Sequence, residues 1–494
     1  MFSTSYAIEL KSGCYLDENS EIASFHLLGK TTDAAYPIAS VSKVFTTLMA
    51  ATKFNLRTVI NGKPIRAPFV TEFYVRSITT ARGKLGYHLH IKGSGDPYFN
   101  RYKMHRAISI LNQMQISEIE LLTFDENVKF LSETDTKQGF YVTVGYNKEG
   151  KPIHELITPL TLKAEMDFPE TKLVKYQYQE SWRILKDYNS SFKMARGLKI
   201  PMVIDPKFTV RKAEFVPAAN FIPDASAKVF NVESQSMATM LKMMNWNSNN
   251  YAANRIYTES GGEAAFKDIF YTKIQIDTKE LSFINGSGQN HDLAGDGPRI
   301  YNQATCSAVL RTLRNLNRRV TGQGLKLTDV MSVVGIDEGS TVGGLVYSND
   351  LTKGKIVAKT GTVGTNITLA GAINTKSGYR YFMFNVGHKI PGATIPEYTA
   401  RKLISEQLNA LVKQTKDVIP LDYKPNLALM KQYGFENYEE DNLSPIEPGA
   451  LFKTEVTSAE VKPTLQVAFS AKPQVINEPQ RYASAFKNVQ PIKK

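Results

Sequence analysis

The chain has 494 residues, a length that favours more than one domain and excludes a small disulfide-stapled module. Its 42% hydrophobic and 22% charged residues are ordinary for a globular protein and exclude wholesale disorder or a collagen-like fibre. The formal net charge of +13 favours an anionic partner such as nucleic acid, an acidic membrane or an acidic polymer. No apolar run is long enough to predict a membrane-spanning helix.

The N-terminal part of the chain predicts a hairpin followed by a helix. Strand-like residues 6–15 and 23–28 flank a turn-rich segment at residues 17–20. The first residues lack a charged start followed by an apolar core, so we expect no signal peptide within this chain. After Pro37, apolar residues at helical spacing predict a helix that begins near Ser40.

The interval from about residue 58 to residue 225 alternates short strand-like and polar pieces, which predicts inserted α/β or β-rich material. Within it, Lys92-Gly93-Ser94-Gly95-Asp96-Pro97 lacks the Gly-Lys-Ser/Thr of a phosphate-binding loop, so we expect a turn. Lys92 is a candidate contact for a substrate carboxylate. The seven histidines have no metal-ligand spacing, and we therefore expect no metal site.

The second half of the chain predicts two helices, a strand meander and a final helix. Residues 236–259 favour two helices broken at residues 245–250, where Asn and Ser favour caps and turns. Strand-like runs at 355–360, 366–373 and 379–386 predict an antiparallel meander, and a helix is expected from Pro396 to about Lys413.

Beyond Lys416 the composition changes. Eight of the 22 prolines lie in the last 79 residues, so we expect an extended tail or linker on the body of the protein. Cys14 and Cys306 are too few to define a disulfide framework, and the sequence leaves open whether they pair.

One pair of residues suggests nucleophilic chemistry. Ser40 and Lys43 are three positions apart at a predicted helix start, which places hydroxyl and amine on one face. A serine hydroxyl is a poor nucleophile, and a lysine accepts its proton only if burial or a second cation lowers the lysine pKa. Lys359 is the candidate second cation. It begins Lys359-Thr360-Gly361-Thr362 at a strand end, where glycine would let a ligand backbone pair with the strand edge.

A third motif, Ser248-x-Asn250, lies between the two predicted helices and offers a hydroxyl for proton relay and an amide for a substrate carbonyl. Each motif alone has a simpler reading: a surface helix turn for Ser-x-x-Lys, a helix cap for Ser-x-Asn and a polar strand end for Lys-Thr-Gly. Their order along the chain is the order of the three motifs in the penicillin-recognising serine enzymes.

The chain resembles one family among these enzymes. Together with Gly93-Ser94-Gly95-Asp96-Pro97, Asn285-Gly286-Ser287-Gly288 and Met331-Ser332-Val333-Val334-Gly335, the three motifs look like the D-Ala-D-Ala carboxypeptidase family typified by low-molecular-mass penicillin-binding protein 4, over about residues 5–412. The 205 positions between Lys43 and Ser248 fit the large insertion of that family and exceed the spacing in an ordinary β-lactamase.

The resemblance implies an α+β fold, with a serine β-lactamase/DD-peptidase-like catalytic domain made of an antiparallel sheet and flanking helices. We expect this domain to be discontinuous, at residues 1–58 and 226–415. One or more inserted accessory domains would occupy residues 59–225, and a Pro-rich C-terminal extension would occupy residues 416–494.

The same resemblance implies roles for the motif residues. Ser40 would be the acylated nucleophile, Lys43 its general base and Ser248 the proton relay to the leaving amine. Asn250 would bind the substrate backbone, and Lys359 would hold the relay and lower the pKa of Lys43. Substrate-binding residues would be Thr360, which would take the terminal carboxylate, together with Gly361, Thr362 and Lys92. The backbone N–H groups of Ser40 and Thr362 would form the oxyanion hole.

Two positions depart from the family pattern. Asn249 and Asn285 stand where aspartate is usual. We expect these changes to affect turn geometry and substrate preference more than activity.

These observations predict a serine DD-peptidase, a D-Ala-D-Ala carboxypeptidase, DD-endopeptidase or both, that hydrolyses peptidoglycan stem peptides and is inhibited by β-lactams. We expect no cofactor, no nucleic-acid partner and a periplasmic or otherwise extracytoplasmic location. The alternatives are a β-lactamase or esterase on the same fold and a catalytically inactive cell-wall-binding scaffold. The balance of the two peptidase activities, the third residue of the stem peptide and the oligomeric state stay open.

Overall fold

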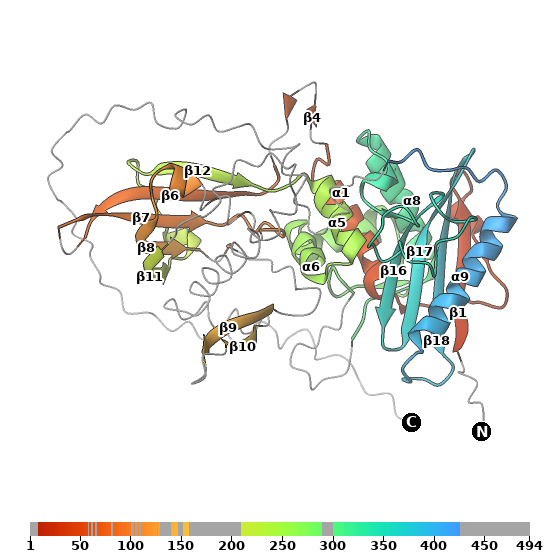
Figure 1. Cartoon of the computed structure of the whole chain (residues 1–494). Coiled ribbons are helices and arrows are strands. Elements are labelled where there is room, and N and C mark those ends of the chain that lie inside the picture. Colours follow the sequence, from red (N-terminus) through yellow and green to blue (C-terminus); the bar gives the residue numbers. More distant parts are fainter. Residues whose placement is uncertain are drawn as a thin grey trace. The chain divides into compact units, whose positions relative to one another are not determined.

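The computed structural model describes residues 8–57, 67–80, 83–99, 209–288 and 300–424, with shorter stretches between residues 59 and 157. Its largest sheet has six strands in the order β15-β16-β17-β18-β1-β2 (Figure 1). The strands are β1 (Ile8–Asp17), β2 (His26–Leu27), β15 (Ser332–Val333), β16 (Ile356–Val363), β17 (Asn366–Thr375) and β18 (Gly378–His388). Every pairing in this sheet is antiparallel, so the predicted meander is confirmed.

The N-terminal hairpin is confirmed in a shortened form. Cys14 pairs with Leu27 and Tyr15 with His26, but β2 has only two residues because residues 22–24 form a 3-10 turn. Strand β1 pairs along its length with β18, which places the first strand of the described chain beside the last one.

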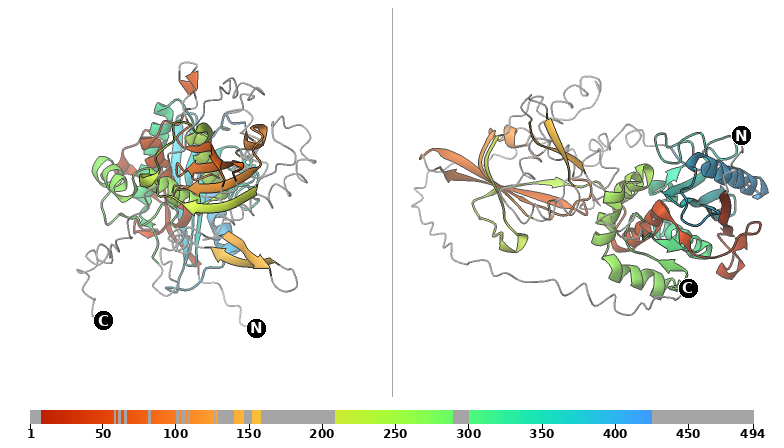
Figure 2. Two further views of the ribbon diagram at one scale, coloured as in Figure 1. Left: turned by 90° about the vertical axis from the view of Figure 1, so that its left-hand side faces the viewer. Right: turned by 90° about the horizontal axis from the view of Figure 1, so that it is seen from below.

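Side chains of the sheet alternate between two apolar layers, as the period of a strand requires. On β18, Tyr381 and Met383 belong to the layer shared with α1 (Ser42–Lys53), α5 (Met237–Asn247), α6 (Asn250–Glu259) and α8 (Cys306–Gly322). Phe382 and Phe384 belong to the layer that α9 (Glu397–Gln414) covers. Figure 2 shows α9 and α1 on opposite sides of the sheet. The α+β class, with helices flanking an antiparallel sheet, is therefore confirmed.

The predicted helices are present with one difference in their bounds, and α7 (Gly262–Phe266) and α8 were not predicted from the sequence. The break between α5 and α6 consists of Ser248 and Asn249 alone, and residues 245–247 continue α5. Asn245 is tolerated inside the helix because its Nδ2 donates to Thr47 Oγ1 at 2.9 Å and to the Val330 carbonyl at 2.8 Å. Helix α7 and a π-helical turn (Lys267–Lys273) follow α6. Of the described helices, none is long and apolar enough to span a bilayer.

A second sheet has five strands in the order β11-β8-β7-β6-β12. These are β6 (Val70–Thr79), β7 (Leu85–Lys92), β8 (Glu118–Phe124), β11 (Thr209–Phe215) and β12 (Lys228–Glu233). Strand β8 runs parallel to β7 and β11, and the other pairs are antiparallel. Since β12 follows residue 225, the sheet draws on residues from both sides of the expected domain boundary.

Three smaller sheets complete the described strands: β4 (Val59–Ile60) with β5 (Lys63–Pro64), β9 (Phe140–Tyr146) with β10 (Pro152–Ile157), and β13 (Leu281–Ser282) with β14 (Gln303–Ala304) and β3 (Tyr36–Pro37). The last sheet leads directly into the turn that contains Ser40.

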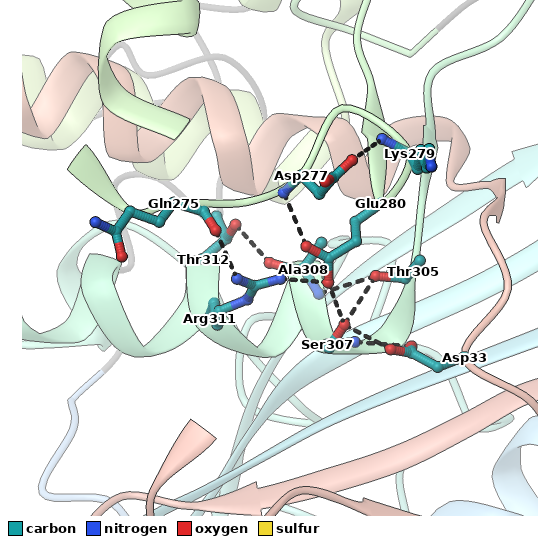
Figure 3. A network of polar contacts seen from close by, with 10 residues as sticks. All are labelled: Asp33, Gln275, Asp277, Lys279, Glu280, Thr305, Ser307, Ala308, Arg311 and Thr312. Carbon is teal, nitrogen blue, oxygen red and sulfur yellow. Dashed lines mark hydrogen bonds and ion pairs between the residues drawn. The ribbon is translucent and has the colours of Figure 1, made fainter. Parts of the chain in front are cut away.

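A disulfide joins Cys14 on β1 to Cys306, the first residue of α8. Polar contacts surround this helix start (Figure 3). Ser307 Oγ donates to Asp33 Oδ2 at 2.6 Å and lies 3.0 Å from Glu280 Oε1, while Arg311 bonds to the same Glu280 oxygen. Carboxylates are favourable beside the N-terminus of a helix. Helix α8 is thus fixed to three other segments of the chain by covalent and polar contacts.

The described chain ends against the body of the protein. Ile419 N–H donates to the Asn374 carbonyl at 3.1 Å, and the Tyr423 hydroxyl donates to Asp337 Oδ1 at 2.6 Å. The remainder of the predicted Pro-rich tail lies outside the described residues.

Candidate active site

Ser40 lies in a one-turn 3-10 helix (Ala39–Val41) that leads into α1. The preceding residue, Ala39, has φ of 47°, a left-handed conformation that costs free energy for a residue with a Cβ atom. Neighbouring elements hold the turn in this conformation. Ile38 N–H donates to the Asn302 carbonyl at 3.0 Å, and Thr368 Oγ1 on β17 donates to the Ile38 carbonyl at 3.0 Å.

Gly361 brings β16 directly against this turn. A Cβ atom at position 361 would lie 2.6 Å from the Ile38 carbonyl oxygen and 3.1 Å from Ala39 Cβ. From the sequence we expected the glycine to open the strand edge for a ligand. In the structure, the space that it leaves is filled by the nucleophile turn itself.

Lys43 is fully buried one helical turn after Ser40. Its Nζ lies 2.9 Å from Ser40 Oγ, 2.6 Å from Asn250 Oδ1 and 3.3 Å from the Ser287 carbonyl oxygen. Burial, and second the positive charge of Lys359, hold the pKa of Lys43 well below its ordinary value.

The three partners of Lys43 Nζ can accept from a charged ammonium, and the same geometry also suits the neutral amine that the chemistry requires. Asn250 Oδ1 and the Ser287 carbonyl oxygen are acceptors only, so they take the two N–H bonds of a neutral lysine. The remaining lone pair then has one partner left, the hydroxyl of Ser40, which can donate to it. The geometry is that of a serine hydroxyl bonded to a base.

Ser248 and Lys359 form a second pair. Ser248 is the residue after α5 and has φ of 59°, a strained left-handed conformation for a non-glycine residue. Lys359 Nζ on β16 lies 3.0 Å from Ser248 Oγ and 2.9 Å from the Thr360 carbonyl oxygen. Burial, and second the charge of Arg401, lower the pKa of Lys359 to about 7.

The structure therefore brings together five of the residues singled out in the sequence: Ser40, Lys43 and Asn250 in one group, and Ser248 and Lys359 in the other. Along the same strand, Thr360 is buried and Thr362 is exposed.

Lys92 is engaged elsewhere. It ends β7 and forms an ion pair of 2.7 Å with Glu72 on β6. The hydrogen bond to Glu72 raises the Lys92 pKa. Among the described residues, none of the Ser40, Lys43, Ser248 or Lys359 side chains shares a hydrogen bond with Lys92.

Asn249 and Asn285, the two residues that depart from the family pattern, still make the hydrogen bonds that stabilise their turns. Asn249 Oδ1 accepts the Ala252 N–H at 2.9 Å and so caps α6 as an aspartate oxygen would. Asn285 Oδ1 accepts the Gly288 N–H at 2.8 Å. In both places an amide oxygen makes the hydrogen bond that the turn needs.

Sequence reasoning missed Asn302, a fully buried side chain behind the nucleophile turn. Its Nδ2 donates to Ser42 Oγ at 3.0 Å and to the Asn285 carbonyl at 2.7 Å, and its Oδ1 accepts the Ile284 N–H at 2.7 Å. These bonds tie the start of α1 to the loop that supplies the Ser287 carbonyl to Lys43. No local motif marks Asn302, because its partners are distant in the chain.

The Gly286-Ser287-Gly288 loop needs its glycines for close packing. A Cβ atom on Gly286 would lie 2.3 Å from the Ala253 carbonyl oxygen, and one on Gly288 would lie 2.0 Å from the Ala39 carbonyl oxygen. Gly288 also has φ of 72°. The loop is thus pressed against both α6 and the nucleophile turn.

Comparison with known proteins identifies relatives of this arrangement. Residues 216–395 match the D-Ala-D-Ala carboxypeptidase 3 (S13) family. No curated protein sequence matches the chain. A solved structure of the predatory endopeptidase Bd3459 from Bdellovibrio bacteriovorus, in complex with the immunity protein Bd3460, is 30% identical, with a TM-score of 0.64; the match covers 87% of this chain and 98% of that one.

Two further structures are similar. The penicillin G-acylated form of the Bdellovibrio endopeptidase is 29% identical over the same shares of both chains, with a TM-score of 0.62. Penicillin-binding protein 4 from Haemophilus influenzae is 14% identical, covers 82% of this chain and 97% of its own, and has a TM-score of 0.50, a likeness of fold.

Proposed function

We propose how the side chains of this chain, which belongs to the D-Ala-D-Ala carboxypeptidase 3 (S13) family, carry out serine DD-peptidase chemistry. The protein is a penicillin-binding serine peptidase of the D-Ala-D-Ala carboxypeptidase/endopeptidase type. Its proposed substrates are peptidoglycan stem peptides, and Ser40 is the proposed nucleophile. The observation that carries this assignment is the 2.9 Å contact between Ser40 Oγ and the buried Nζ of Lys43.

In the acylation step, Lys43 removes the hydroxyl proton as Ser40 Oγ forms a bond to the carbonyl carbon of the scissile D-Ala. The carbonyl oxygen becomes an oxyanion, which the backbone N–H groups of Ser40 and Thr362 stabilise. Ser248, held by Lys359, gives its hydroxyl proton to the leaving nitrogen and receives in turn the proton that Lys43 took from Ser40. The C–N bond breaks, the amine departs and the acyl group stays on Ser40.

Deacylation reverses the proton path. Water attacks the ester carbon and one of its protons passes through the Ser248 and Lys43 pair to Ser40 Oγ, so the bond from Ser40 Oγ to the acyl carbon breaks, the serine hydroxyl is restored and the shortened peptide leaves as a carboxylate. Asn250 contributes in two ways: its Oδ1 orients Lys43, and no described residue accepts a hydrogen bond from its Nδ2, which is therefore available to a substrate carbonyl.

The domain division follows the sheets. We place the catalytic domain on the two chain segments that form the six-stranded sheet and its helices, and the inserted part between α1 and α5.

The disulfide between Cys14 and Cys306 supports a periplasmic or other oxidising, extracytoplasmic location.

The test is the identity of the acylated serine and of the cleaved bond. Penicillin should add covalently to Ser40, and peptide mapping by mass spectrometry would locate the adduct. The Ser40→Ala variant should stay folded but should no longer be labelled. An adduct on another serine overturns the assignment.

Incubation with purified cross-linked and uncross-linked muropeptides should then give products shortened after D-Ala. Because the chain is similar to the endopeptidase Bd3459, this experiment must include the cross-linked substrate. Rapid release of the penicilloyl group without muropeptide cleavage would favour a β-lactamase or esterase. Absence of any labelling would favour an inactive wall-binding scaffold.

A further inference from the structure

The two carbonyl groups that precede the strained Ala39 are both bound by side chains of the large sheet. Asn385 Nδ2 on β18 donates to the Pro37 carbonyl at 2.9 Å, and Thr368 Oγ1 on β17 donates to the Ile38 carbonyl at 3.0 Å. Thr368 and Asn385 are direct partners in the register of these strands, and both are fully buried. Two neighbouring strands thus hold two consecutive carbonyls of one segment.

This arrangement requires a bend at Ile38. In an extended strand, consecutive carbonyls point in opposite directions, so one sheet could not bind both of them. Ile38 has φ of −100° and ψ of −5°, near the sparsely populated bridge region, and Ala39 follows with φ of 47°. Such conformations cost free energy and persist where the surrounding contacts determine them. The two side-chain donors supply these contacts.

The bend sets the direction of the Ser40 N–H. The Ile38 carbonyl also accepts the Val41 N–H at 3.0 Å, which closes the 3-10 turn around Ser40. N–H groups in the first turn of a helix have no acceptor within that helix. The orientation of this turn therefore decides where the Ser40 N–H points.

The same row of side chains reaches the strand that carries the second proposed oxyanion donor. Gly361, next to Thr362 on β16, pairs with Thr368 on β17. A Cβ atom at position 361 would lie 2.3 Å from Thr368 Oγ1, so the glycine leaves the space through which this hydroxyl reaches the nucleophile turn. Gly361, Thr368 and Asn385 thus follow one another across β16, β17 and β18.

A chain of amides fixes the orientation of Asn385. The Pro37 carbonyl can only accept, so Asn385 presents Nδ2 to it and Oδ1 to its other neighbour. That Oδ1 accepts from Asn366 Nδ2 at 2.8 Å, and Asn366 Oδ1 accepts from the Thr365 hydroxyl at 2.8 Å. Thr365 lies in the turn between β16 and β17. The donor to Pro37 is therefore held from the end of β16.

We propose that Thr368 and Asn385 are positioning residues of the oxyanion hole, which hold the N–H groups of Ser40 and Thr362 at the separation that one oxyanion needs. The inference rests on the proposed function and deepens it. Oxyanion donors act at about 2.7 to 3.1 Å from the developing charge, so a small rotation of the turn weakens them. Acylation and deacylation both form an oxyanion at this place, and both depend on the row.

The experiment removes one hydroxyl and keeps its shape. Thr368→Val has nearly the same volume but no donor, and Thr368→Ser keeps the donor. The matched control is Thr375→Val, the same change on the same strand, where Oγ1 donates to the Gly378 carbonyl at 2.6 Å. Mass spectrometry follows acylation of Ser40 by penicillin G and hydrolysis of the acyl-enzyme from pH 6 to 10, and thermal unfolding measures stability.

Thr368→Val should slow both acylation and hydrolysis of the acyl-enzyme about 10- to 100-fold, with the pH profile of acylation in the wild-type position. Thr368→Ser should retain both rates within about threefold of wild type, because its hydroxyl can still donate to Ile38. Thr375→Val should unfold at a lower temperature than wild type and should acylate at the wild-type rate.

A Thr368→Val protein that is less stable but acylates at the wild-type rate would overturn the proposal, because the hydroxyl would then only stabilise the fold. A displaced pH profile would also overturn it, since the effect would then pass through Lys43. If Thr368→Val does not fold, Asn385→Ala removes the other donor and is judged by the same two rates. Wild-type protein that penicillin does not label at Ser40 would instead refute the proposed function.

Discussion

Asn302 and Ser42 share a hydrogen bond of 3.0 Å that joins two parts of the chain 260 positions apart. Through it, the loop that offers the Ser287 carbonyl to Lys43 is fixed to the first residue of α1. Because the Asn302 amide makes donor and acceptor bonds at once, an isosteric carboxylate cannot replace it.

Asn302→Asp should therefore lower both stability and penicillin acylation. We expect the free energy of unfolding to fall by about 1 to 3 kcal/mol, because the donors to Ser42 Oγ and to the Asn285 carbonyl are lost inside the protein. Thermal unfolding and acylation rates measure the two effects. Asn374→Asp makes the same chemical change at a partly exposed site on β17, and it should leave acylation unchanged.

Lys359→Met should move the acidic limb of the acylation pH profile upward. Removing the Lys359 charge raises the pKa of Lys43, so the free base appears only at higher pH. The displacement should be partial, because burial is the larger cause of the low Lys43 pKa. A profile identical to wild type, with a normal rate, would remove Lys359 from the mechanism.

The same substitution should stabilise the fold at neutral pH. Between pH 7 and 10.5 the unfolded chain holds a proton on Lys359 that the folded chain has lost, so wild-type stability rises with pH across this window. A fall in pKa from 10.5 to about 7 costs on the order of 5 kcal/mol at pH 7 and below. The two hydrogen bonds of Lys359 offset about 1 kcal/mol each.

Lys359→Met should thus melt at a higher temperature than wild type at pH 7, and the difference should shrink toward pH 10. A difference in melting temperature that is constant over this range would contradict the depressed pKa.

The disulfide between β1 and α8 should contribute to stability because it closes a loop of 292 positions. Replacing Cys14 and Cys306 by serine should lower the free energy of unfolding by about 2 to 5 kcal/mol. Denaturant titration of the oxidised protein, the reduced protein and the double variant measures this. Equal stability of all three would show that the cross-link is dispensable.

Local patterns in the sequence predicted the meander, α9 and the motif residues, because strand alternation, helical spacing and short motifs are properties of neighbouring residues. Asn302 and Arg401 were not predicted, since each acts through partners far away in the chain. The sequence also could not show why position 361 is glycine, because the turn that packs against Gly361 belongs to another segment of the chain. Lys92 was chosen from a nearby motif, but Glu72 across the sheet is its ion-pair partner.

The proposed mechanism requires Lys43 to act as a neutral base toward Ser40, and Lys43→Arg tests this directly. Arginine keeps a long cationic side chain but does not lose its proton in proteins. The measurement is the rate of penicillin acylation of Ser40, followed by mass spectrometry from pH 6 to 10 on protein shown to be folded. We predict acylation at least about a thousandfold slower than wild type at every pH. Acylation by the arginine variant at a rate near that of wild type would contradict the central claim.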